Sequence, residues 1–141
     1  MFNPTHFHPM IVHFPVALIL AGFLAEVAWL IFKKDAFSVA GFWLLVLGAI
    51  SACAAFLTGE FFTGDMSGAA GEIKGNHELF AFITLLMSVA AAAFRIYLKY
   101  ARKEDTRLRW AAFGIYSLAA IAVSVTGFYG GILVYNYMMP I

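Results

Sequence analysis

Charged residues are scarce in this chain of 141 residues: they make up 12% of it, whereas hydrophobic residues make up 63%. Soluble domains carry about twice that share of charge, so an ordinary soluble domain is excluded. The single cysteine, Cys53, excludes an internal disulfide and is typical of a small buried hydrophobe. The net charge of +1 gives no reason to expect nucleic-acid binding. The sequence also lacks a phosphate-binding loop and a nucleophile–base set, which argues against a stand-alone enzyme.

What the chain has instead is four long apolar runs, at about residues 9–32, 38–58, 77–97 and 110–135. Each is close to the roughly 20 residues that a helix needs to span a bilayer. The runs are too long and too uniform for barrel strands, and a spanning helix satisfies its own backbone hydrogen bonds. We therefore predict an all-α integral membrane protein, an antiparallel four-helix bundle that forms one domain over residues 1–141.

The basic residues predict how the bundle is oriented. Eight of the nine lie in the 33–38 connection or in region 95–109, and only Lys74 lies in the 59–76 loop. By the positive-inside rule, both termini and the 59–76 loop face outward. The first run is not expected to be a signal peptide, because it is too long and no basic residue precedes it.

Histidines gather at the predicted outward end, where all four of them lie: His6, His8, His13 and His77. The first and third helices each begin with a histidine. The second and fourth each carry a Thr-Gly pair, at 58–59 and 126–127. These matches indicate a parallel repeat of two hairpins, with the first and third helices diagonal and their histidines facing each other.

Small residues follow two of these histidines at helical spacing. Ala17 and Ala21 follow His13, and the corresponding residues after His77 are Ala81, Thr84, Ser88 and Ala92. Small residues favour close helix packing in membranes. They would equally form a slot for a flat macrocycle beside each histidine, and the sequence leaves both interpretations open.

Two prolines flank His13. Pro9 suits the first position of a helix, where its missing N–H has no cost. Pro15 lies inside the helix, removes the hydrogen bond to the carbonyl of Ile11, and should loosen the first turns. We expect this distortion to set the direction of the His13 imidazole, whereas His6 and His8 lie at the membrane boundary.

The stretch "HPMIVHFPVAL" resembles the opening signature of a bacterial membrane protein family known as domain of unknown function 2231. The matching residues are His8, Pro9, Val12, His13, Phe14, Pro15 and Leu18, with weaker support from His77 and the segment Gly130–Tyr135. The resemblance implies a four-helix protein of the bacterial inner membrane. Because family members occur fused to cytochrome c-like or Rieske-type domains, it also implies a redox partner of that kind and a role in electron transfer.

We therefore expect a b-type haem with axial ligands His13 and His77, and with His8 as the substitute for either. The slot would be lined by Ala17, Ala21, Ala81 and Thr84, and the propionates would be met by Lys74 and Asn76. Such a protein would be an electron carrier or a redox subunit.

Two alternatives remain open. Glu60 and Glu78 could join the histidines in a non-haem site for copper, zinc or iron. The chain could instead be a structural subunit, or a homo-oligomer that packs through Gly127 and Gly131. In either case, we expect Glu26 to be neutralised by an intramembrane pair with Arg95.

Overall fold

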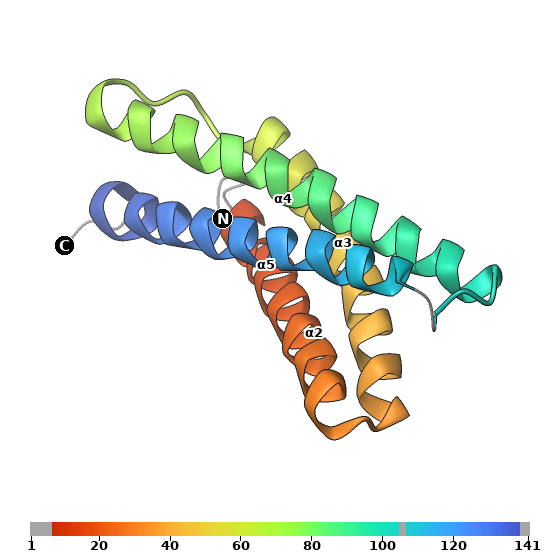
Figure 1. The fold of residues 1–141 in the computed structure, drawn as a ribbon. Coiled ribbons are helices and arrows are strands. Elements are labelled where there is room, and N and C mark those ends of the chain that lie inside the picture. Colours follow the sequence, from red (N-terminus) through yellow and green to blue (C-terminus); the bar gives the residue numbers. More distant parts are fainter. Residues whose placement is uncertain (1–6, 105–106, 139–141) are drawn as a thin grey trace.

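The computed structural model describes residues 7–104 and 107–138, and this part of the chain is helical throughout, with turns but no strand. Four of its helices are long and apolar enough to cross a membrane, which confirms the predicted all-α membrane bundle. The orientation of the termini stays a prediction. The elements are α1 (Phe7–Ile11), α2 (His13–Phe32), α3 (Asp35–Phe62), α4 (Gly68–Tyr100), α5 (Leu108–Leu133) and the short π-helical segment η2 (Val134–Met138). Figure 1 labels α2 to α5.

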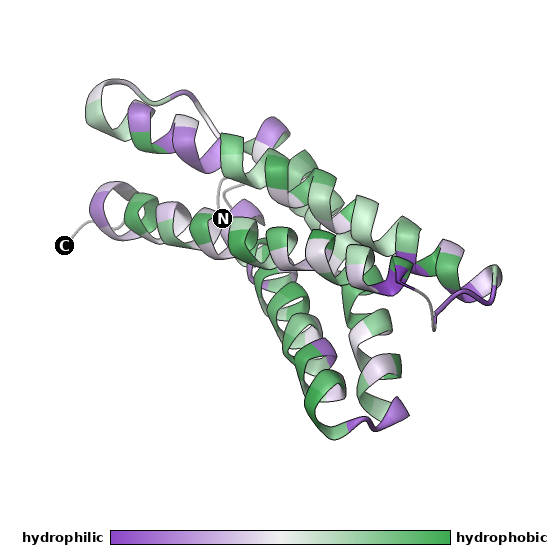
Figure 2. Cartoon of the chain, viewed as in Figure 1, coloured by the Kyte–Doolittle hydropathy of each residue, from purple (hydrophilic) through white to green (hydrophobic). Residues whose placement is uncertain are grey.

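The helices form two antiparallel hairpins, α2 with α3 and α4 with α5, which cross each other at an angle (Figure 1). Between the hairpins, α3 packs on α4 and α2 packs on α5, so α2 and α4 are diagonal in the bundle. Figure 2 shows that hydrophilic residues lie mainly near the helix ends and in the connections, with apolar residues along the spans between them. This distribution suits a protein whose middle lies in lipid.

The break between α1 and α2 lies at Val12, three residues before Pro15. Pro15 is buried and has no N–H to donate to the carbonyl of Ile11, so the helix is interrupted near that carbonyl. The amide of Val12 still donates to the carbonyl of His8 at 3.1 Å. The distortion predicted from Pro15 is therefore present as a turn at Val12, and the first span continues through it from His8 to Phe32.

The third span is longer than its apolar run. Helix α4 begins at Gly68, nine residues before the predicted start at residue 77. The added turns are polar, and a Lys74–Glu78 ion pair at helical spacing supports them. Hydropathy marked only the part of the helix that suits lipid, and it missed the turns that extend beyond it.

The buried faces of α2 and α4 repeat at a constant offset of 69 residues. They pair Pro15 with Thr84, Ile19 with Ser88, Gly22 with Ala91, and Glu26 with Arg95. The buried faces of α3 and α5, the second helices of the two hairpins, repeat at an offset of 71 residues. This offset pairs Gly41 with Ala112, Leu45 with Tyr116, and Ala52 with Val123. The structure thus supports the two-hairpin repeat inferred from the sequence.

The centre of the bundle is closed by a contact between the hairpins. The hydroxyl of Tyr116 on α5 donates to the carbonyl of Ile19 on α2 at 3.1 Å, and both residues are fully buried. Gly22 makes room for this hydroxyl, because a Cβ there would lie only 2.2 Å from it. The packed centre leaves one polar cluster on each side of it, towards the two ends of the bundle.

Candidate functional site

His8 on α1 and His77 on α4 lie next to each other, one from each hairpin. Their ring centroids are 6.1 Å apart and their planes are nearly perpendicular, at 84°. Both rings are half-buried. The two residues are 69 apart in sequence, so they occupy equivalent positions in the repeat. The diagonal placement predicted for the first and third helices accounts for how two histidines so distant in sequence meet.

Hydrogen bonds to the neighbouring helices assign the tautomer of each ring. His77 Nδ1 lies 3.1 Å from the carbonyl oxygen of Thr126, which can only accept, so Nδ1 carries the proton. His8 Nδ1 lies 3.2 Å from Thr58 Oγ1, and that hydroxyl already donates its proton to the carbonyl of Ala55. The hydroxyl therefore accepts from His8. Both rings are held as Nδ1–H tautomers, which leaves the lone pair of each Nε2 free to bind a metal.

A glycine accompanies each imidazole. A Cβ at Gly59 of α3 would lie 2.9 Å from His8 Cε1, and one at Gly130 of α5 would lie 3.2 Å from His77 Cε1. These two glycines are 71 residues apart, the same offset that relates the buried faces of α3 and α5. The repeat thus supplies each histidine with a glycine that leaves it room. For His77 this glycine is Gly130 and not the Gly127 of the Thr-Gly pair.

The pairing of His13 with His77 that the sequence suggested differs from the pairing in the structure. His13 is exposed at the start of α2, and Ala17 and Ala21 below it are exposed as well. The buried face of α2 instead descends from His8 through Pro15 and Ile19. His8, named as the substitute ligand, takes the place expected for His13, because it lies seven residues before Pro15 and thus on the buried face of the first span.

The stripe below His77 does face inward. Thr84, Ser88 and Ala92 are buried and Ala81 is half-buried, so on α4 the small residues are a packing face. The hydroxyls of Thr84 and Thr126 lie 3.1 Å apart and join α4 to α5 directly below the histidine pair. Of the two predicted slots, only this one adjoins the site.

The other residues predicted at this end lie around the pair. Lys74 forms its ion pair with Glu78, whose side chain is 56% exposed, Asn76 is half-buried, and Glu60 is exposed. No group of three or more His, Cys, Asp or Glu side chains converges within residues 7–104 and 107–138. His6 lies outside the described residues. The site is thus a pair of imidazoles without a carboxylate ligand.

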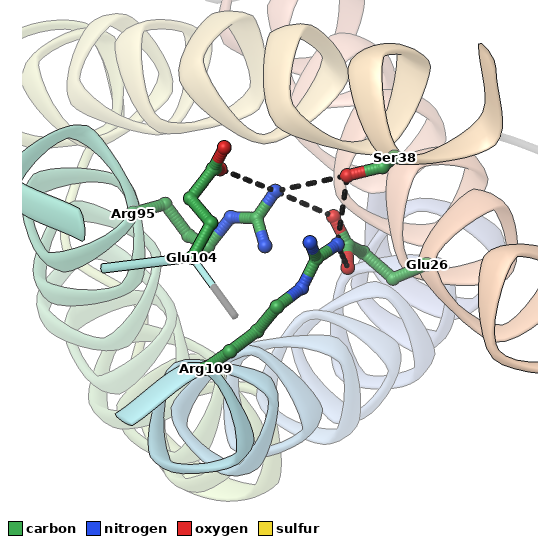
Figure 3. Close-up of polar contacts among 5 residues, drawn as sticks. All are labelled: Glu26, Ser38, Arg95, Glu104 and Arg109. Carbon is green, nitrogen blue, oxygen red and sulfur yellow. Dashed lines mark hydrogen bonds and ion pairs between the residues drawn. The ribbon is translucent and has the colours of Figure 1, made fainter. Parts of the chain in front are cut away.

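At the opposite end, Glu26 is buried between two arginines (Figure 3). Its Oε1 lies 3.1 Å from Arg95 and its Oε2 lies 3.2 Å from Arg109. The predicted Glu26–Arg95 pair is confirmed, and Arg109 is an addition that the sequence reasoning did not find. Arg109 lies at the position of the repeat that is equivalent to Ser38, and the Ser38 hydroxyl lies 2.7 Å from the Arg109 guanidinium.

The glycine pair proposed for oligomer contacts lies near the histidine end of α5. A Cβ at Gly127 would lie 3.8 Å from Val16 of α2, and one at Gly131 would have no neighbour within 4 Å among the described residues. A homo-oligomer through these glycines stays a prediction.

The two polar clusters are about one membrane thickness apart. Glu26 follows His8 by eighteen residues and Arg95 follows His77 by the same number. At a rise of 1.5 Å per residue this spacing is about 27 Å, close to the hydrocarbon thickness of a bilayer. We infer that the histidine pair and the arginine cluster lie near opposite membrane surfaces.

Of three comparisons with known proteins, only the one with family models found a match, to a family of predicted membrane proteins. No curated protein and no solved structure matches the chain. A family model described as "Predicted membrane protein (DUF2231)" matches residues 4–140, nearly the whole chain. The protein therefore belongs to the DUF2231 family of predicted membrane proteins.

Proposed function

We propose that His8 and His77 are the two axial ligands of a b-type haem, and that the protein transfers electrons at one end of its membrane bundle. The observation that carries this proposal is the tautomer pair: two adjacent imidazoles, each anchored at Nδ1 and each with a free Nε2. Histidines that bind metals are held in this way, with the second ring nitrogen donating to a carbonyl or hydroxyl.

The distance between the rings suits a shared metal ion. With bonds of about 2 Å from each imidazole nitrogen to the metal, two rings on opposite sides of one ion have centroids roughly 6 Å apart. The observed separation is 6.1 Å.

The chemistry of the donor set favours haem over a bare ion. A structural zinc site uses four protein ligands, and the described residues offer two imidazoles with no third His, Cys, Asp or Glu beside them. In haem, the porphyrin nitrogens complete the coordination and only two axial ligands are needed. Ala81, half-buried below His77, would line the macrocycle, and Lys74 and Asn76 on α4 would meet its propionates.

When bound, haem supplies a one-electron redox centre, and the protein supplies its ligands and its position. Two protein ligands leave no position for a substrate on the iron, which favours electron transfer over oxygen chemistry. The cytochrome c-like and Rieske-type domains implied by the family resemblance are suitable partners. The bacterial inner membrane is the suitable location.

Absorbance spectroscopy of the protein purified after expression with ample haem tests this function. The reduced wild type should show the sharp Soret band and split visible bands of a low-spin, bis-imidazole haem. His8→Ala and His77→Ala should each abolish that spectrum. His13→Ala is the matched control, because His13 is exposed on the same span, and it should keep the spectrum.

Two results would overturn the haem proposal. One is a wild-type protein that purifies colourless yet retains zinc or copper stoichiometrically, which would assign the pair to another metal. The other is a His13→Ala protein that loses its colour while His8→Ala keeps it.

A further inference from the structure

Among the described residues, each of the two buried arginines makes its polar contacts through one of its three guanidinium nitrogens. Arg95 contacts Glu26, Ser38 and Glu104 through Nη2, and Arg109 contacts Glu26 and Ser38 through Nη2. The Nε atoms of both are buried without a hydrogen-bond partner in the part of the chain that the structure describes. Arg95 is 3% exposed and Arg109 is 9% exposed, so both guanidiniums depend mainly on protein partners. Unpaired buried donors on two guanidiniums indicate an acceptor that these residues do not supply.

A cavity of about 190 Å³ adjoins this cluster. Its polar lining consists of Glu26, Glu104 and Arg109, and its remaining walls are apolar and aromatic: Trp29, Leu30, Trp110 and Phe113. The Arg109 guanidinium lies 3.5 Å from the centre of the Trp29 ring, which holds it against the cavity wall. The cavity therefore combines one fixed guanidinium and two carboxylates with walls suited to an apolar group.

Glu104 is the weakly held member of the cluster. Its carboxylate lies 3.7 Å from Arg95, beyond hydrogen-bonding distance, and its side chain is 36% exposed (Figure 3). It belongs to the connection between α4 and α5 and not to a helix. A competing anion could replace it without disturbing the two shorter bonds to Glu26.

The charges of the cluster define the charge of that anion. With both glutamates in place, two arginines and two glutamates are neutral. When Glu104 leaves, the buried set of Arg95, Arg109 and Glu26 carries one positive charge. A phosphate diester carries one negative charge and several acceptor oxygens, and the edge of a guanidinium binds such oxygens in pairs.

We propose that this cavity is a phosphate-binding site with Arg109 in its lining and Arg95 behind it on the shared carboxylate of Glu26, in which Glu104 occupies the place of the ligand until a phosphate displaces it. The aromatic and aliphatic walls favour the headgroup of an anionic phospholipid, whose glycerol and chains would meet Trp29, Leu30 and Trp110. Free phosphate shares the same chemistry and is the other possible source.

Tryptophan fluorescence of the full chain in non-ionic detergent tests the site, because Trp29 and Trp110 line the cavity. We expect titration with phosphatidylglycerol to change the fluorescence saturably, and an equal titration with zwitterionic phosphatidylcholine to change it much less. Glu104→Gln removes the competing charge and should tighten phosphatidylglycerol binding about two- to fivefold, the size of an exposed ion pair. Arg109→Gln should weaken it about tenfold or more, the size of a charge-assisted hydrogen bond.

Inorganic phosphate identifies the source of the ligand. Millimolar phosphate that saturates the same signal and blocks the lipid would assign the site to free phosphate. Phosphate without effect beside a lipid response would assign it to the headgroup. Glu78→Gln, which removes an exposed carboxylate at the opposite end of the bundle, is the control and should leave every titration unchanged.

The proposal is overturned if phosphatidylglycerol and phosphatidylcholine give equal responses and phosphate gives none. It is also overturned if Glu104→Gln binds phosphatidylglycerol no more tightly than the wild type. The second criterion is independent of Arg109→Gln, so it holds even if that variant does not fold.

Discussion

The two ends of the bundle place side chains at equivalent positions of the repeat and reach opposite outcomes. At one end the equivalent residues are identical, His8 and His77, and at the other they carry opposite charges, Glu26 and Arg95. Two neutral imidazoles can face each other without repulsion and leave two ligand atoms available. Two like charges in the same arrangement would repel strongly in lipid, whereas opposite charges attract and neutralise each other. A pair of hairpins thus produces a ligand site where its residues match and an ion pair where they differ.

The largest effect should come from Glu26→Ala at the arginine end. It leaves two buried guanidiniums without their common carboxylate, and breaking a buried ion pair in this way costs about 3–5 kcal/mol of unfolding free energy. Denaturation of the purified protein in detergent measures the loss. Changing Arg95 and Arg109 to methionine in the same chain should recover much of it, since no buried charge then remains.

Glu104→Ala is the control for that experiment. Its carboxylate is partly exposed and more distant from Arg95, so its removal should cost less than about 1 kcal/mol. A triple variant no more stable than Glu26→Ala alone would show that the cluster is not held by its charges.

An intermediate effect should come from two glycines of α3, one at each end of the bundle. A Cβ at Gly41 of α3 would lie 2.9 Å from Glu26 Oε1, and one at Gly59 would lie 2.9 Å from His8 Cε1. Overpacking typically costs about 1–3 kcal/mol. Gly41→Ala should lower stability by about that amount and leave haem binding unchanged, whereas Gly59→Ala should displace the imidazole and reduce haem binding.

Gly114→Ala is the matched control on α5, because nothing lies within 4 Å of a Cβ there among the described residues. Replacing an open helical glycine by alanine should stabilise the chain by about 0.5–1 kcal/mol. If Gly59→Ala binds haem as the wild type does, the close approach of α3 to His8 does not position the ring.

The smallest effect should come from the two threonines of the histidine end. Thr58→Val removes the hydroxyl that accepts from His8 Nδ1. Thr126→Val keeps the carbonyl that accepts from His77 and loses the hydroxyl contacts with Thr84 and with the carbonyl of Ala122. Interhelical hydrogen bonds in membranes are worth about 0.6 kcal/mol on average, or roughly threefold in affinity.

A haem titration of the two apoproteins compares them directly. We expect Thr58→Val to weaken haem binding about threefold and Thr126→Val to leave it unchanged. Equal weakening in both variants would mean that the hydroxyls act through packing and not through the orientation of the imidazole.

The sequence by itself determined the number of spans, the pairing of Glu26 with Arg95 and the repeat of two hairpins. Length and apolar composition decide the number of spans, because a bilayer admits helices and closed barrels and little else, and the apolar runs are too long for barrel strands. The second follows from the cost of an unpaired charge at membrane depth. The third was indicated by His8 and His77, which are equivalent at the offset of 69, whereas the Thr-Gly pairs are 68 residues apart and so three residues out of register with the offset of 71 between α3 and α5.

Only the tertiary structure decided which histidine meets His77, which small residues face inward, and that Arg109 joins Glu26. Lipid is as apolar as the packed interior, so hydrophobicity does not distinguish the buried face of a membrane helix from its lipid-facing one. His13 with Ala17 and His8 with Pro15 were equally acceptable stripes on that criterion. The packing of the two hairpins decides which face of the first span is covered, so His8 lies inside the bundle and His13, on another face of the same span, is exposed.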